Sequence, residues 1–135
     1  MRCLIVEDDY AAQQVMGMLL ADYAECTLAP DGYEAVEFFQ MALDEGRPYD
    51  LICLDIMMPA QDGHETLKQI RQIEKERGTG AFDGVKVIMT TALTDTTHIS
   101  AAFQEGCESY LIKPIRRDTF FQEMKKLGLV LQKSP

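Results

Sequence analysis

A lone carboxylate, Asp55, follows the apolar run Leu51 to Leu54 in the stretch "LICLDIMMPAQDG". A continuous apolar run of this length predicts a buried strand, so Asp55 would stand at its carboxyl end, half out of the core. In an open α/β sheet, ligands bind at the edge where the strands end. An aspartate at that edge can act as a nucleophile or as a ligand for a hard metal ion.

Other apolar runs of the chain also end in residues that carry chemistry. These residues are acids, hydroxyls and one lysine: Glu7, Asp8 and Asp9 after the first run, Thr90 and Thr91 after the fourth, and Lys113 with Pro114 after the fifth. If all these runs are parallel strands with right-handed crossovers, their ends share one edge of the sheet. The side chains would then converge on a single site.

The convergence of acids has an electrostatic consequence. Neighbouring strands lie about 4.8 Å apart, so Asp8 and Asp55 would nearly touch if the first and third strands adjoin. Two like charges about 4 Å apart repel by roughly 4 kcal/mol at an effective dielectric constant near 20. Oxygen ligands from Glu7, Asp8 and Asp55 suit Mg²⁺, and Lys113 would add a further positive charge. This setting predicts that Asp55 takes a phosphoryl group in line.

Five repetitions of strand and helix position these residues. Strands are expected at Arg2 to Val6, Cys26 to Ala29, Leu51 to Leu54, Val85 to Thr90 and Ser109 to Ile112. The first helix should carry a stripe from Ala12 through Val15 to Tyr23, and the second should begin near Asp31. The fifth should begin at Thr119, with Gln122 three residues later completing a capping box. Such alternation predicts an α/β fold whose mostly parallel sheet has helices on both faces.

Length, composition and charge limit the classes of function. The chain of 135 residues is expected to form one domain of ordinary apolar content. No apolar run of membrane-spanning length and no signal peptide is visible, which favours a cytoplasmic location. The net charge of −9 opposes direct binding to nucleic acid or to an anionic membrane.

The cysteines and histidines suggest no site of their own. The four cysteines lack C-x-x-C spacing and are expected to be reduced structural residues. His64 and His98 have no partner at ligand spacing, so both are expected on the solvated surface.

The four segments "LIVEDD", "LICLDIMMPAQDG", "MTTA" and "YLIKP" together resemble the receiver domain of two-component response regulators. The resemblance covers nearly the whole chain. Among receivers, the chain is similar in type to the stand-alone chemotaxis regulators. It implies a flavodoxin-like fold, a five-stranded parallel sheet of order 2-1-3-4-5. We expect residues 1–128 to form the receiver domain and residues 129–135 a short tail.

The resemblance also assigns roles by residue. It implies a Mg²⁺ site formed by Glu7, Asp8, Asp55 and the Met57 backbone carbonyl, with Asp55 also as the phosphoacceptor. Thr91 and Lys113 would contact the phosphoryl group, and Tyr110 would be the aromatic switch. Asp9 would be an outward neighbour. The donor would be a histidine kinase or a phosphotransfer protein.

By the same resemblance the chain would be a signalling switch rather than an enzyme acting on external substrates. Its fourth helix, fifth strand and fifth helix would change contacts with a downstream protein. A homodimer that forms on phosphorylation is a further possibility. The native start and short tail favour a stand-alone receiver over a piece of a longer chain, and both remain open.

Three rival functions are weaker. A phosphatase of the haloacid dehalogenase type would need a second aspartate where the chain has Met57. A flavodoxin-like electron carrier would need a Ser/Thr-rich phosphate loop after the first strand, where "EDDY" repels phosphate instead. A pseudo-receiver would lack an acid or the lysine, and here the set is complete.

Overall fold

A parallel five-stranded sheet of order β2-β1-β3-β4-β5 forms the centre of the computed structural model, which describes residues 1–58, 61–79, 83–92 and 96–129. The strands are β1 (Arg2–Val6), β2 (Glu25–Ala29), β3 (Leu51–Asp55), β4 (Lys86–Thr91) and β5 (Ser109–Ile112). The helices are α1 (Tyr10–Leu20), α2 (Gly32–Asp44), α3 (Gly63–Glu76), α4 (Thr96–Glu105) and α5 (Arg117–Lys126). The predicted fold class and strand order are confirmed.

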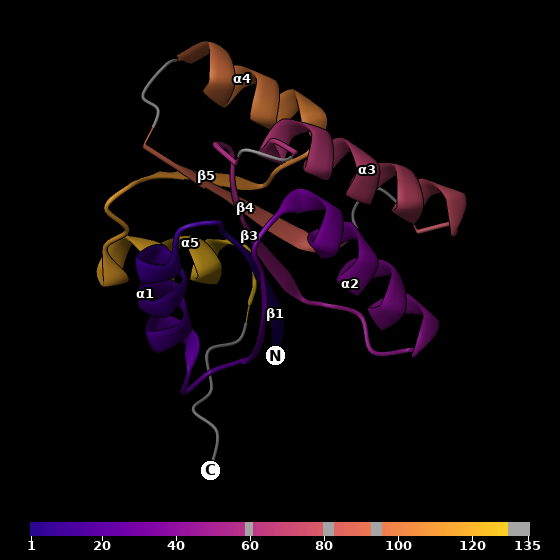
Figure 1. Cartoon of the computed structure of the whole chain (residues 1–135), viewed down its shortest axis with the longest axis horizontal. Coiled ribbons are helices and arrows are strands. Elements are labelled where there is room, and N and C mark those ends of the chain that lie inside the picture. The colour runs from indigo at the N-terminus through magenta and orange to yellow at the C-terminus, as the bar shows by residue number, and fades with distance from the viewer. Residues whose placement is uncertain (59–60, 80–82, 93–95, 130–135) are drawn as a thin grey trace.

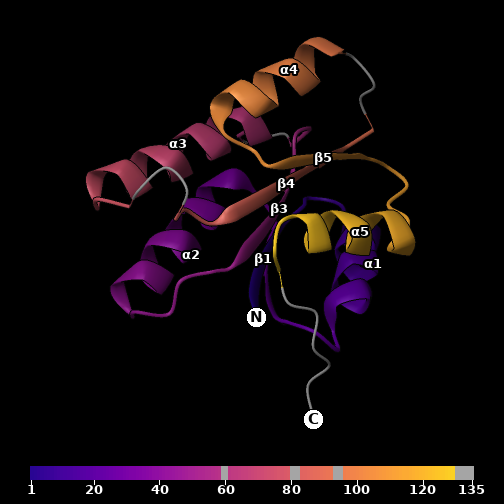
Figure 2. The same ribbon diagram turned by 180° about the vertical axis from the view of Figure 1, so that it is seen from behind.

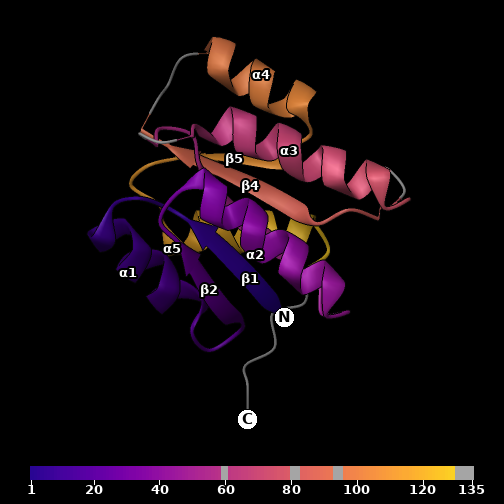
Figure 3. The ribbon, with the colours of Figure 1, turned by 45° about the vertical axis from the view of Figure 1, so that its right-hand side comes forward.

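Helices cover both faces of the sheet. Figures 1 and 2 show α1 and α5 on one face and α2 and α3, with α4 beside α3, on the other. Figure 3 shows β1 and β2 between α1 and α2. Because successive residues of a strand point to opposite faces, Leu4 packs with the α2 and α3 side while Ile5 packs with the α1 and α5 side. None of the described helices has the length and apolar character needed to cross a bilayer.

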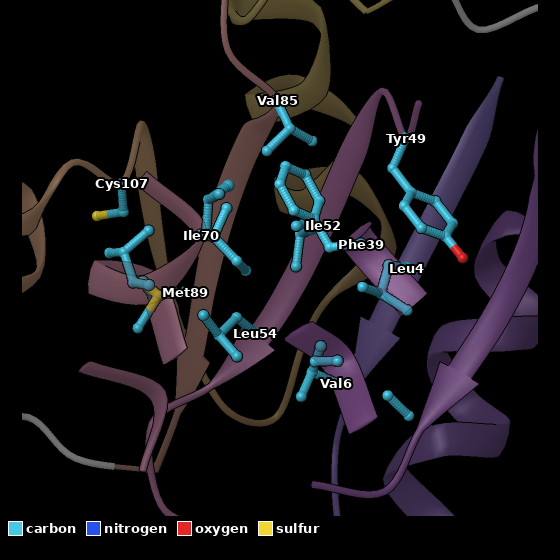
Figure 4. Packing of buried hydrophobic residues seen from close by; sticks show 14 of the residues in the cluster. Leu4, Val6, Phe39, Tyr49, Ile52, Leu54, Ile70, Val85, Met89 and Cys107 are labelled. Atoms are coloured by element: carbon cyan, nitrogen blue, oxygen red, sulfur yellow. The ribbon is translucent and has the colours of Figure 1, made fainter. Parts of the chain in front are cut away.

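Each face has its own apolar core. Figure 4 shows the larger one, where Phe39 of α2 and Ile70 of α3 lie over Ile52 and Leu54 of the central strand. The smaller core places Phe120 and Met124 of α5 against the opposite side of the sheet. All residues of β3 are buried, as its continuous apolar sequence predicts. This double burial holds the end of β3, and therefore Asp55, in a fixed place.

Two local predictions about the helices are wrong. Helix α1 ends at Leu20, so Tyr23 lies beyond it, and Val15 is 48% exposed because it sits on the solvent side of Met16 and Leu20. Helix α5 starts at Arg117 and not at Thr119, and its N-cap Arg116 has no side-chain cap hydrogen bond. Burial of the apolar face of α5 therefore sets its start, and the weaker capping signal at Thr119 does not.

Arg71 links α3 to the residues that precede β4 and β5. Its guanidinium donates to the Gly106 carbonyl at 2.7 Å and the Val85 carbonyl at 2.8 Å, and it pairs with Glu74 at 2.7 Å and with Glu108 at 2.9 Å. Glu108 in turn accepts from the Val87 amide at 2.6 Å. Burial raises the pKa of Glu108, although the Val87 amide and Arg71 oppose the rise. One side chain thus satisfies several groups that water scarcely reaches.

Replacing Arg71 with Met should lower the free energy of unfolding by about 2 to 3 kcal/mol, because two largely buried carboxylates lose their counter-charge. Urea unfolding at neutral pH measures the loss. The control is Lys126→Met, whose partner Glu123 forms an exposed pair with it, and this change should stay within about 0.5 kcal/mol. Equal losses in both variants would contradict the role given to Arg71.

Candidate functional site

The register of the sheet brings the predicted site residues to one edge. Val6 lies opposite Leu54 and Asp55 lies opposite Thr90, so Glu7 follows its strand beside Asp55. The Ile56 amide donates to the Thr90 carbonyl at 3.1 Å, and the Lys113 amide donates to the Thr91 carbonyl at 2.7 Å. These backbone hydrogen bonds extend the pairing of the sheet past the ends of the strands. They place Lys113 close to the end of β3.

Three carboxylates gather at this edge. Glu7, Asp8 and Asp55 each offer one oxygen, and these oxygens lie within 4.8 Å of one another. Glu7 and Asp55 are each only 3% exposed, whereas Asp8 is exposed. A cluster of hard oxygen ligands with one open side fits Mg²⁺, which binds through few carboxylates and keeps several waters. The residues present therefore fit the expected metal.

Lys113 is the cation that holds the two buried acids together. Its Nζ lies 2.6 Å from Glu7 Oε2 and 3.3 Å from Asp55 Oδ2. Burial raises the pKa of Glu7, and the charge of Asp55 adds to the rise while the hydrogen bond from Lys113 opposes it. Burial alone would lower the pKa of Lys113, but its bond to Glu7 and the charge of Asp55 raise it overall. Lys113 therefore stays charged at neutral pH.

Backbone groups fix the loops around the cluster. Asp9 caps α1 by accepting from the Ala12 amide at 2.9 Å, and its own amide donates to Glu7 Oε1 at 3.1 Å. The Met57 amide donates to Asp55 Oδ1 at 3.2 Å. A Cβ on Gly63 would come within 2.8 Å of the Ile56 Cα, so the first turn of α3 approaches the end of β3 as closely as a glycine allows.

The remaining predicted residues lie on the same edge or next to it. Thr91 is fully buried at the end of β4, opposite Ile112. Tyr110 is half-buried in β5 and packs against the larger core. Met57 exposes 60% of its surface. The exposed position of Asp9 agrees with its expected outward place.

The prediction for the two histidines is wrong. His64 Nδ1 lies 2.7 Å from Glu105 Oε2, and His64 Nε2 lies 3.2 Å from His98 Nδ1. His64 and Glu105 each expose only 14% of their side chains. These residues come from α3 and α4 and are distant in the sequence, so no spacing rule could pair them. No sequence pattern pointed to Gln13, whose side-chain amide donates to the Glu7 backbone carbonyl at 2.6 Å.

Comparisons with known proteins agree with the fold. A family model described as the response regulator receiver domain matches residues 3–125. The chain is 34% identical over 134 residues to the sensor histidine kinase GacS of Pseudomonas protegens, covering 97% of this chain and 14% of that protein. It is 30% identical over 135 residues to the probable C4-dicarboxylate response regulator DctR of Bacillus subtilis, covering 98% of this chain and 54% of that one.

A solved structure, the chemotaxis protein CheY4 of Vibrio cholerae, aligns with a TM-score of 0.78 at 25% identity, covering 93% of this chain and 97% of that chain. The chain thus spans only 14% of the kinase and about half of the regulator named above.

Replacing Lys113 with Met should lower the free energy of unfolding by about 3 kcal/mol at pH 7.5 without metal, because Glu7 and Asp55 then face each other unneutralised. Lowering the pH should recover part of the loss. The folded-state pKa of Glu7 would rise further above its unfolded value, and such a group contributes stability that is present below the unfolded pKa and lost as pH rises through the folded pKa.

Urea unfolding of the parent and the variant at pH 5 and pH 7.5 measures this. Lys126→Met serves as the control, because its Nζ lies 3.4 Å from Glu123 in an exposed pair. A deficit in Lys113→Met that is the same at both pH values would contradict the charge argument.

Proposed function

Because this chain belongs to the response regulator receiver domain family, we propose that its Asp55 accepts a phosphoryl group from the phosphohistidine of a histidine kinase or phosphotransfer protein. One observation carries the proposal. The Lys113 ammonium bridges Glu7 and Asp55 while Asp8 stands beside them on the open side. That arrangement leaves a nucleophilic carboxylate next to two kinds of group that stabilise phosphoryl oxygens: a fixed cation and ligands for a metal.

Glu7, Asp8, Asp55 and the Met57 backbone carbonyl would hold Mg²⁺. When bound, the ion would neutralise charge on the phosphoryl oxygens during transfer. Asp8 would serve as the most accessible ligand, since Glu7 and Asp55 are buried. The hydrogen bond from the Met57 amide to Asp55 Oδ1 supports the role given to the Met57 carbonyl, because it keeps the Met57 backbone beside the carboxylate.

The chemical step is a direct transfer. One oxygen of the Asp55 carboxylate attacks the phosphorus, the phosphorus–nitrogen bond of the phosphohistidine breaks, and its electron pair returns to the imidazole. The product is an acyl phosphate on Asp55. Lys113 would keep its proton throughout and would move its contact from the carboxylate to a phosphoryl oxygen.

The bound phosphoryl group would then bias the conformation of the chain. The Thr91 hydroxyl would gain a phosphoryl oxygen as acceptor, and the end of β4 would move toward it. Tyr110 would change its packing in response, which would favour a pre-existing minor state of α4, β5 and α5. In this proposal the chain is a switch for contacts with a downstream protein and does not bind nucleic acid or a membrane itself.

The proposal takes residues 1–128 as the receiver domain, which agrees in extent with the family match over residues 3–125. Of the expected tail, residues 130–135 lie outside the described part of the chain. The proposal includes a cytoplasmic location, where a kinase or phosphotransfer protein would meet the chain. It treats the chain as a signalling switch that catalyses only its own phosphorylation and slow dephosphorylation.

Incubation with Mg²⁺ and a small phosphodonor such as acetyl phosphate should add one phosphoryl group to the parent and none to Asp55→Asn, because the amide is not a nucleophile for this transfer. Intact-protein mass spectrometry measures the addition. Asp22→Asn removes an exposed carboxylate far from the site and should label like the parent. Undiminished labelling of Asp55→Asn would refute the assignment, and chelating the metal should stop the reaction in the parent.

Phosphorylation should change amide hydrogen exchange in α4, β5 and α5 and leave α2 unchanged, because α2 packs mainly on α3, β1 and β2. Thr91→Ala removes the proposed hydroxyl contact, so this variant should still be phosphorylated but should show a smaller change. Exchange that is identical with and without phosphorylation would contradict the switching proposal. Parent-like exchange changes in Thr91→Ala would contradict the role given to its hydroxyl.

A further inference from the structure

A second group of titratable side chains lies between α3 and α4, apart from the phosphoacceptor residues. His64 of α3 sits between Glu105 and His98, both of α4. The two imidazole rings are roughly parallel, with centroids 5.4 Å apart and planes inclined by 27°. His64 and Glu105 are largely buried, and His98 is half-buried. The proposed phosphoryl chemistry uses none of these residues.

The carboxylate fixes which nitrogen of His64 carries a proton. An ionised carboxylate only accepts hydrogen bonds, so His64 Nδ1 donates to Glu105 across their 2.7 Å separation. In neutral His64 the other nitrogen, Nε2, then presents a lone pair. That lone pair faces His98 Nδ1 at 3.2 Å, and the hydrogen between these two nitrogens belongs to His98.

We propose that His64 Nε2 and His98 Nδ1 form a binding site for a borderline transition-metal ion such as Zn²⁺, which replaces the hydrogen between them and joins α3 to α4. Zinc–imidazole bonds of about 2.0 to 2.1 Å at a tetrahedral angle place two ligand nitrogens about 3.3 Å apart. The observed separation is 3.2 Å. The two nitrogens therefore have the separation that one ion requires, and a modest rotation of both rings would turn their lone pairs from each other toward the ion.

The proton balance of binding is simple. His98 gives up the hydrogen on Nδ1 and takes one on Nε2 through solvent, so it remains neutral and changes only its tautomer. Glu105 keeps its hydrogen bond to His64 Nδ1, which orients the ring and makes Nε2 a better ligand. Within the described residues these are the two ligand atoms at this place, so water would fill the other coordination positions.

Isothermal titration with Zn²⁺, in the presence of saturating Mg²⁺ to occupy the acidic cluster, tests the site. The parent and Asp55→Asn should each bind one Zn²⁺ at this site, because it does not depend on the phosphoacceptor. His64→Gln and His98→Gln should both lose that ion. Glu105→Gln should weaken binding about 10- to 100-fold, while Glu65→Gln, an exposed acid on the first turn of α3, should bind like the parent.

A second readout separates loss of the site from loss of the fold. Urea unfolding without metal establishes that each variant is folded, and thermal unfolding with Zn²⁺ then reports binding. At free Zn²⁺ about 100 times the dissociation constant, the ratio of folded to unfolded parent should rise about 100-fold, with no such rise in folded His98→Gln. Absence of one-site binding by the parent, or binding that folded His64→Gln and His98→Gln retain, would overturn the proposal.

Discussion

Repulsion between Glu7 and Asp55 is the constraint on which the rest of the site depends. Parallel pairing of β1 with β3 forces these two acids together, since Val6 and Leu54 lie opposite each other one step earlier. Both side chains are almost fully buried, so water does little to screen them. The strands cannot slip to relieve the repulsion, because a one-residue shift would exchange the side chains that pack in the two separate cores on either face of the sheet. The fold must therefore supply positive charge at this point.

Lys113 supplies part of that charge and is itself held by the backbone. Its amide donates to the Thr91 carbonyl, so the backbone at the end of β5 is held beside the end of β4. Three carboxylates facing one ammonium still leave the site short of positive charge. The excess negative charge is what makes the edge receptive to a divalent cation, and the cation in turn makes it receptive to a phosphoryl group.

The sequence was sufficient to predict those features that depend on strand ends and not those that depend on helix packing. Asp55 and Lys113 could be placed because each follows an apolar run, and parallel strands end on the same edge. Thr119 was misassigned as a helix start because burial of Phe120 and Met124 outweighs a capping signal. His64 and His98 could not be paired, since their contact depends on how α3 and α4 lie across each other.

The contacts of α4 with α3 determine how this helix can respond to the site. At its carboxyl end, Arg71 binds the Gly106 carbonyl and His64 binds Glu105, so two side chains of α3 hold this end. The Cys107 amide closes the last turn by donating to the Ala102 carbonyl at 3.1 Å. The amino end follows Thr91, the residue that the proposal makes responsive to the phosphoryl group. His64 also contacts His98 in the first turn of α4, so α3 holds both ends of this helix. A displacement at Thr91 that moved α4 would therefore have to break or carry along these contacts, and an ion shared by His64 and His98 would strengthen the link between the two helices and reduce that movement.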